Sequence, residues 1–188
     1  MRRNATLAGL ILALLGGALG VVALIAGPRP DRAVAPPGKP AWTEVPWPFP
    51  MDQWGRGKAF ACQPEDCGAD VRLYLRAKVG FCDCVSDIDD EEVDRVSDFD
   101  LLGGGHAALG SGRPIEVRWM KGRSRAYALS AGAAPPSSAL AVAFHDHCDM
   151  IAATAVIGGE RPAAQEGAVL ELLNSDRVLR WAEVTLGL

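Results

Sequence analysis

A continuous apolar stretch near the N-terminus constrains this chain more than any other feature. Residues 7–26 consist only of leucine, isoleucine, valine, alanine and glycine. A helix needs about 20 apolar residues to cross a bilayer, whereas the apolar part of a cleaved secretory signal has about 7–15. The stretch therefore predicts an uncleaved signal anchor over residues 1–27, which takes no part in a globular fold. The alternative is a cleaved signal peptide with a long apolar region.

The charges around this stretch predict its orientation. Arg2 and Arg3 precede it, and basic residues remain on the cytoplasmic side of a membrane. We therefore expect a single-pass protein of the inner (plasma) membrane, anchored through residues 7–26, with its C-terminal domain in the periplasm. The net charge of -4 gives no support for a nucleic-acid partner, since such binding needs a clustered basic surface.

Proline is concentrated just after the anchor. Eight of the thirteen prolines lie in residues 28–50. Proline fixes φ and lacks an amide donor, so this range predicts an extended linker. Four aromatic residues lie near its end: Trp42, Trp47, Phe49 and Trp54. They either pack onto the domain, lie at the membrane interface or bind a partner, and packing onto the domain is the favoured interpretation.

Residues 51–188 are predicted to form the extracytoplasmic domain. Apolar and polar residues alternate over residues 71–78 and 115–120, which is typical of half-buried strands. Residues 125–130 are expected to return as a partner strand after a turn at Lys121–Gly122. Residues 139–144 are all apolar, and residues 150–157 are apolar apart from Thr154, so both ranges lack a polar face and predict central strands that are covered on both faces.

Two segments have helical character. Acidic residues 89–92 precede an apolar pattern and suit a helix N-terminus, where free amides carry partial positive charge. Residues 162–186 carry apolar stripes at helical spacing, with a possible break at Asn174–Ser175. The sequence thus predicts an α+β fold: a small antiparallel sheet of about five strands with a C-terminal helix packed on it.

The cysteines indicate disulfides, since the anchor places them in an oxidising compartment. There are five of them: Cys62, Cys67, Cys82, Cys84 and Cys148. Cys62 and Cys67 form the simplest local pair, and Cys148 is expected to pair with Cys82 or Cys84. A zinc site is an alternative, although zinc ribbons normally use C-x2-C spacing. Thiol redox chemistry is a further alternative, but no C-x-x-C motif supports it.

The densest group of metal-capable side chains is His145, His147 and Cys148. In an extended segment the two histidines point the same way, and with a thiolate they suit copper or zinc. The competing interpretation is an exposed hairpin tip whose cysteine belongs to a disulfide, and we favour it. The two interpretations exclude each other, because a metal site requires Cys148 to be reduced.

Catalytic motifs are absent from the sequence. It has no G-x-S-x-G, P-loop or H-E-x-x-H pattern, and Gly103–Ala108 fits G-x-G-x-x-A without the preceding strand that dinucleotide binding requires. A hydrolase using His106 and Ser111 is a weak alternative. We predict a non-enzymatic accessory protein without a cofactor, stabilised by disulfides, that binds another envelope protein or membrane complex. The alternative is a copper- or zinc-binding or thiol-redox chaperone that uses the five cysteines with His145 and His147.

Overall fold

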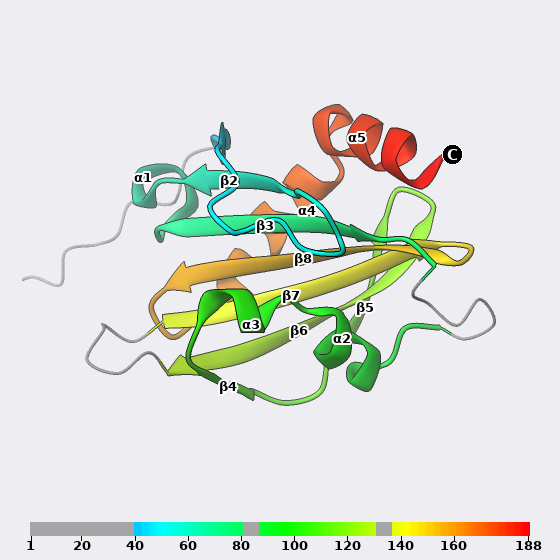
Figure 1. Ribbon diagram of the computed structural model, residues 1–188. Coiled ribbons are helices and arrows are strands. Elements are labelled where there is room, and N and C mark those ends of the chain that lie inside the picture. The colour runs from blue at the N-terminus through cyan, green and yellow to red at the C-terminus, as the bar shows by residue number, and fades with distance from the viewer. Residues whose placement is uncertain (1–39, 81–86, 131–136) are drawn as a thin grey trace, which may run out of the picture. The chain divides into compact units, whose positions relative to one another are not determined.

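The computed structural model describes residues 40–80, 87–130 and 137–188, all of which belong to one compact unit. The predicted signal anchor, most of the predicted linker, and Cys82 and Cys84 lie outside the described residues. Within the described ranges, no helix is long and apolar enough to cross a membrane. The fold is α+β, with helices packed against an antiparallel sheet, as the sequence predicts (Figure 1).

The sheet has eight strands, and every pair of neighbours is antiparallel. The strands are β1 (Thr43–Val45), β2 (Lys58–Cys62), β3 (Val71–Lys78), β4 (Gly105–Ala108), β5 (Arg113–Val117), β6 (Met120–Ser130), β7 (Ser137–Asp146) and β8 (Asp149–Gly158). Their order is β1-β2-β3-β8-β7-β6-β4, and β5 also pairs with β6. The helices are α1 (Pro64–Cys67), α2 (Asp90–Val96), α3 (Phe99–Leu102), the 3-10 helix η1 (Pro162–Gln165), α4 (Glu166–Leu173) and α5 (Asp176–Leu186).

The strand count corrects the prediction of about five. The missed strands are β1 and β4, which have three and four residues, and β2, which is buried along most of its length. Such strands are too short, or too evenly apolar, to show alternation. β1 also lies inside the range predicted as linker. The turn after β5 occurs at Arg118–Trp119 instead of Lys121–Gly122, because Arg118 adopts a φ of 55°.

One face of the sheet carries large apolar side chains that pack against α4 and α5. Alternate residues of β3, β7 and β8 contribute to it: Val71, Leu73, Leu75, Leu140, Val142, Phe144, Ile151 and Ile157. They meet Val169, Leu172, Leu173, Val178 and Leu179 of the C-terminal helices. Burying each such side chain stabilises the fold by roughly 1.5–3 kcal/mol. The segment predicted as one C-terminal helix forms two helices, α4 and α5, which are separated at Asn174–Ser175, where the sequence indicates a possible break.

The opposite face is covered by α2 and α3, which lie in front of the sheet in Figure 1. Here β7 presents Ala139, Ala141 and Ala143, whose small side chains let the helices approach closely. Asp89 caps the N-terminus of α2, and its side chain accepts a hydrogen bond from the amide of Glu92 at 2.8 Å. This is the acidic N-terminus that the sequence predicts.

Candidate functional site

The segment between β1 and β2, residues 46–57, is called the strap. It lies against the face of the sheet that α2 and α3 cover, which we call the second face; the face under α4 and α5 is the first. It turns sharply at Asp52–Gly55, where the amide of Gly55 donates to the carbonyl of Asp52 at 2.9 Å and Gly55 has a φ of 71°. Gly57 then passes so close to β3 that an added Cβ would lie 2.1 Å from the carbonyl oxygen of Leu75. Only glycine permits this approach, so the strap is fixed tightly on β3.

An ion cluster holds the strap in place. The guanidinium of Arg76, which is 2% exposed, donates to both carboxylate oxygens of Asp52 in the strap, at 2.5 and 2.9 Å. It also donates to both oxygens of Asp98, at 3.0 Å each, and Lys78 donates to Asp98 at 2.8 Å. Two cations thus face two carboxylates. Such bidentate pairing satisfies the buried guanidinium and fixes its partners in space.

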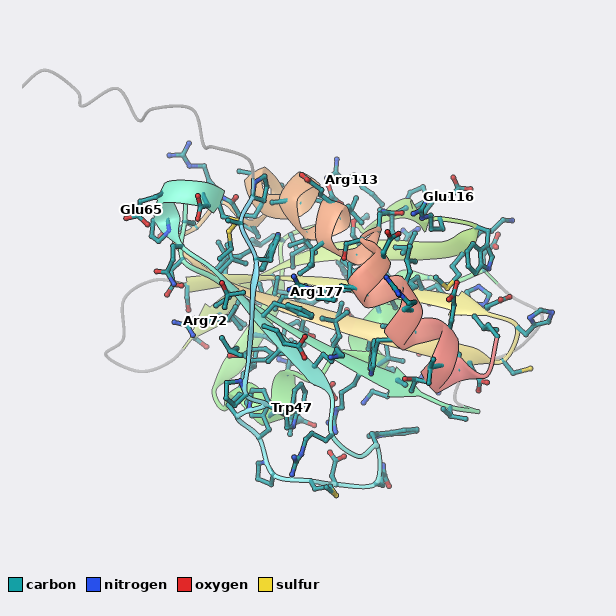
Figure 2. All side chains as sticks on the ribbon, turned by 90° about the horizontal axis from the view of Figure 1, so that it is seen from above. Trp47, Glu65, Arg72, Arg113, Glu116 and Arg177 are labelled. Atoms are coloured by element: carbon teal, nitrogen blue, oxygen red, sulfur yellow. A yellow bond between two sulfur atoms is a disulfide. The ribbon has the colours of Figure 1, made fainter. Side chains whose placement is uncertain are left out.

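Aromatic rings complete this cluster. Arg76 lies 5.6 Å from the ring centre of Trp47, and Lys78 lies 4.8 Å from that of Trp54. The strap tryptophans therefore pack onto the domain, which is the favoured interpretation of the sequence; Figure 2 shows Trp47 in the strap. Burial raises the pKa of Asp52, but hydrogen bonds from the Trp54 amide and Arg76 outweigh it and leave that pKa below its ordinary value.

A pocket of about 310 Å³ opens between the strap and α3. We call it the aromatic groove. Its lining includes the rings of Phe49, Tyr74, Phe99 and His106 and the apolar side chains of Leu102 and Val156. On one side Phe49 packs edge-on against Tyr74, with 4.8 Å between ring centres. On the other side Phe99 stacks on His106 at 4.3 Å. The groove is thus bounded by two pairs of rings carried by different elements.

The glycine-rich segment forms one rim of this groove. Gly103 and Gly104 have φ values of 64° and 102°, and they turn the chain from α3 into β4. An added Cβ on Gly105 would lie 2.7 Å from the hydroxyl of Ser130. The G-x-G-x-x-A pattern therefore runs from a helix into a strand, the reverse of the dinucleotide-binding order. Its glycines serve the turn and the close approach of β4 to β6.

The groove has the chemistry of a binding surface. Its titratable lining groups are Tyr74 and His106. Burial raises the pKa of Tyr74, so its hydroxyl stays protonated at neutral pH. His106 stacks on Phe99, and Ser111 lies outside the groove in the segment between β4 and β5. The arrangement offers flat apolar surfaces with few polar groups, which suits recognition of an apolar group.

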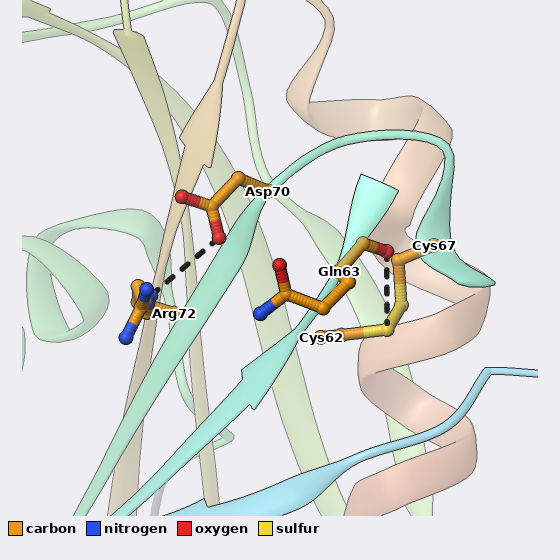
Figure 3. Close-up of a disulfide and its surroundings, with 5 residues drawn as sticks. All are labelled: Cys62, Gln63, Cys67, Asp70 and Arg72. Carbon is orange, nitrogen blue, oxygen red and sulfur yellow. Dashed lines mark hydrogen bonds and ion pairs between the residues drawn. A yellow bond between two sulfur atoms is a disulfide. The ribbon is translucent and has the colours of Figure 1, made fainter. Parts of the chain in front are cut away.

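The first predicted disulfide is present. Cys62 at the end of β2 and Cys67 at the end of α1 are bonded, and both are buried (Figure 3). Cys148 is also disulfide-bonded. Its pairing with Cys82 or Cys84 stays a prediction.

The predicted metal ligands lie at the tip of the β7–β8 hairpin. His147 has a φ of 54° and lies in the turn between β7 and β8. The Nδ1 atom of His147 lies 2.8 Å from Asp146, and Nδ1 of His145 lies 3.1 Å from the carbonyl oxygen of His147. Residues 40–80, 87–130 and 137–188 contain no group of three or more side chains suited to hold a metal. The copper or zinc site at His145, His147 and Cys148 stays a prediction, and it would require the disulfide of Cys148 to be reduced.

Known proteins supply no family for this arrangement: no family model, curated protein or solved structure matches the chain. Sequence reasoning missed both Arg76 and Asp98, because alternation placed Arg76 and Lys78 on a solvated face. The sequence does contain one signal that could have found them. Arg76 and Lys78 lie on one side of a strand, and the acidic residues 87–100, which include their partner Asp98, follow in the chain.

Proposed function

We propose that this is a membrane-anchored periplasmic accessory protein whose domain binds another envelope protein or membrane complex through the aromatic groove. The observation that supports it is the pair of aromatic walls, Phe49 with Tyr74 and Phe99 with His106, around a pocket of about 310 Å³. This volume is at the lower end of the range for ligand pockets. It suits one or two apolar side chains of a partner.

The supports of the groove reduce the cost of binding. Phe49 belongs to the strap, which the ion cluster of Arg76, Asp52, Asp98 and Lys78 fixes on β3. Phe99 is 4% exposed and contacts Tyr127 of β6 at 4.6 Å between ring centres. A wall that is already ordered loses little side-chain entropy when a partner binds. The site is therefore preorganised.

The proposed anchor would keep the groove near the membrane. Residues 28–39 lie between the apolar stretch and the first described residue, and twelve residues of extended proline-rich chain reach about 37 Å. That reach would place the domain beside the periplasmic parts of other membrane proteins. The linker thus supports a partner that is itself in the envelope.

Site-specific cross-linking tests this proposal. A photoreactive residue replaces Phe49 or Leu102 in the full-length protein, and irradiation follows in intact cells. A discrete adduct with one envelope protein is expected from both positions. The matched control is Val184, which is 83% exposed on α5 and far from the groove lining. The proposal fails if the groove positions give no adduct, or if Val184 gives the same one.

A further inference from the structure

The two ends of the sheet are built differently. β1 ends the strand order on one side, and β4 and β5, which pair with different stretches of β6, end it on the other. β1 carries Glu44, which is paired with Lys58 at 2.5 Å, and it is flanked by Pro40 and Pro46. Charged side chains and prolines at a sheet edge oppose the addition of another strand. The β1 edge is therefore protected.

The β4 edge has neither charged side chains nor prolines. Residues 103–112 contain no charged residue and no proline, and every residue from 103 to 111 is exposed. Within the described part of the chain, β4 pairs only with β6. In Figure 1 it lies at the outer end of the sheet. An uncharged edge of this kind is a template for strand pairing.

The backbone register identifies the groups that face outward. The amide of Leu109 donates to the carbonyl of Ala126 on β6 at 2.8 Å, and the pairing continues backward to Gly105 opposite Ser130. In an antiparallel pair, hydrogen bonding to one neighbour involves every second residue. Gly105 and Ala107 therefore direct their backbone groups to β6. The N–H and C=O groups of His106 and Ala108 point away from it.

We propose that the free edge of β4 binds an extended segment of a partner protein, which adds as a further strand through backbone hydrogen bonds to His106 and Ala108. Two outward N–H groups and two outward C=O groups, two residues apart, match the repeat of an extended chain. Leu109, which is 54% exposed, offers one apolar contact beside them. This edge adjoins the aromatic groove, which the His106 side chain lines, but the backbone contacts at His106 and Ala108 do not need the groove, so the inference does not rest on the proposed function.

The short length of β4 and the net charge of the whole chain favour a partner segment over a second copy of this chain. β4 has four residues, and pairing two copies over four residues buries far less than the roughly 1,200 Å² of a specific interface. Two copies would also bring together chains that each carry a net charge of -4. A single extended segment brings no second folded domain against the edge.

The test uses the full-length chain in detergent, and the probe is a library of phage-displayed linear decapeptides. Selected peptides are synthesised with a fluorophore, and their affinities are measured by fluorescence anisotropy. Ala108→Pro removes one outward amide, and proline is tolerated where an edge N–H faces solvent. We expect it to weaken binding about tenfold, as the loss of one hydrogen bond does. Ala108→Ser keeps the amide and should bind like the wild type.

Two further measurements keep the test independent of the fold of the proline variant. N-methylation of alternate peptide amides should abolish binding to the unmodified protein in one of the two alternation patterns. Amide hydrogen exchange should slow at His106 and Ala108 when the peptide is bound. The proposal is overturned if no peptide is selected, or if binding is lost in Tyr74→Ala but kept in Ala108→Pro. A concentration-dependent dimer that Ala108→Pro dissociates would assign the edge to a second copy and overturn it as well.

Discussion

The two faces of the sheet are held by different forces. The face under α4 and α5 is packed with leucine, isoleucine, valine and phenylalanine, and its polar contacts include those of Glu166 with Ser124 and Arg113. The face under α2 and the strap has alanines at its centre and charged groups around them. Apolar packing has little directional preference, whereas paired charges fix both distance and angle. The first face thus supplies stability, and the second fixes the walls of the aromatic groove.

Paired charges also fix α2 on the second face. Arg123, Arg125 and Tyr127 follow one another on one side of β6. Arg123 binds Asp90, while Arg125 and Tyr127 both bind Asp94, at 2.8 and 2.5 Å. Asp90 and Asp94 are one helical turn apart, so a row on the strand meets a row on the helix. The helix therefore has a defined position although alanines lie beneath it.

Phe144→Ala should have the largest effect, because Phe144 is fully buried on the apolar face. We expect the free energy of unfolding to fall by about 3–5 kcal/mol in urea denaturation. Ala143→Gly, next to it on the other face, is the matched control and should cost about 1 kcal/mol. Equal losses at the two positions would contradict the assignment of stability to the first face.

Cys148→Ser should act on both faces, because Cys148 lies in the turn between β7 and β8, which contribute to each. If Cys148 pairs with Cys82 or Cys84, the closed loop of about 65 residues predicts a loss of roughly 2–5 kcal/mol. Mass spectrometry of the non-reduced protein should show the linked peptides. His145→Ala with His147→Ala should cost less than about 0.5 kcal/mol. Stoichiometric metal that these histidine changes remove would favour the chaperone alternative.

Arg76→Ala should disrupt the second face and release the strap. Removing one member of a buried ion pair typically costs 3–5 kcal/mol, and we expect about 2–4 because Asp52 remains 38% exposed. Limited proteolysis should then cut within residues 46–57. Arg72→Ala, on the same strand with a side chain 46% exposed, should change stability by less than about 0.5 kcal/mol. An intact strap in Arg76→Ala would show that the tryptophans alone hold it.

The sequence predicted the apolar face far better than the polar one. Leu73 and Phe144 sit in strands whose alternation or apolar run predicted burial correctly. Arg76 is buried in spite of that alternation, since its partner Asp98 is 22 residues away and its other partner, Asp52, lies in the strap. Pairing between distant charges leaves no local periodicity. The groove was missed for the same reason, because its rings come from four separate segments.

Tyr127→Phe should have a smaller effect on the second face. Tyr127 is 1% exposed, and its hydroxyl donates to Asp94. Burial first, and then the carboxylate of Asp94, raise the pKa of Tyr127. The loss of this hydrogen bond should cost about 1–1.5 kcal/mol, since Arg125 still pairs with Asp94. In a double-mutant cycle with Asp94→Asn, the two losses should not add. Additive losses would mean that the hydroxyl contributes nothing through Asp94.

The smallest expected effect is a dependence on acid pH that belongs to the second face alone. A hydrogen bond from Arg123, then one from the Gly112 amide, lowers the pKa of Asp90, and the pKa of Asp52 is also lowered. A carboxyl whose pKa is lower in the folded state stabilises the fold above its unfolded pKa, about 3.9, and this contribution is lost as the pH falls through the folded value. Both groups are partly exposed, so their joint contribution to the free energy of unfolding should be at most about 1 kcal/mol.

Urea denaturation between pH 6 and 2 tests this contribution. The free energy of unfolding should fall less steeply with acid in the Asp52→Asn, Asp90→Asn double variant than in Glu65→Gln, an exposed control in α1. Identical pH profiles would mean that packing, and not ionisation, holds the second face in place.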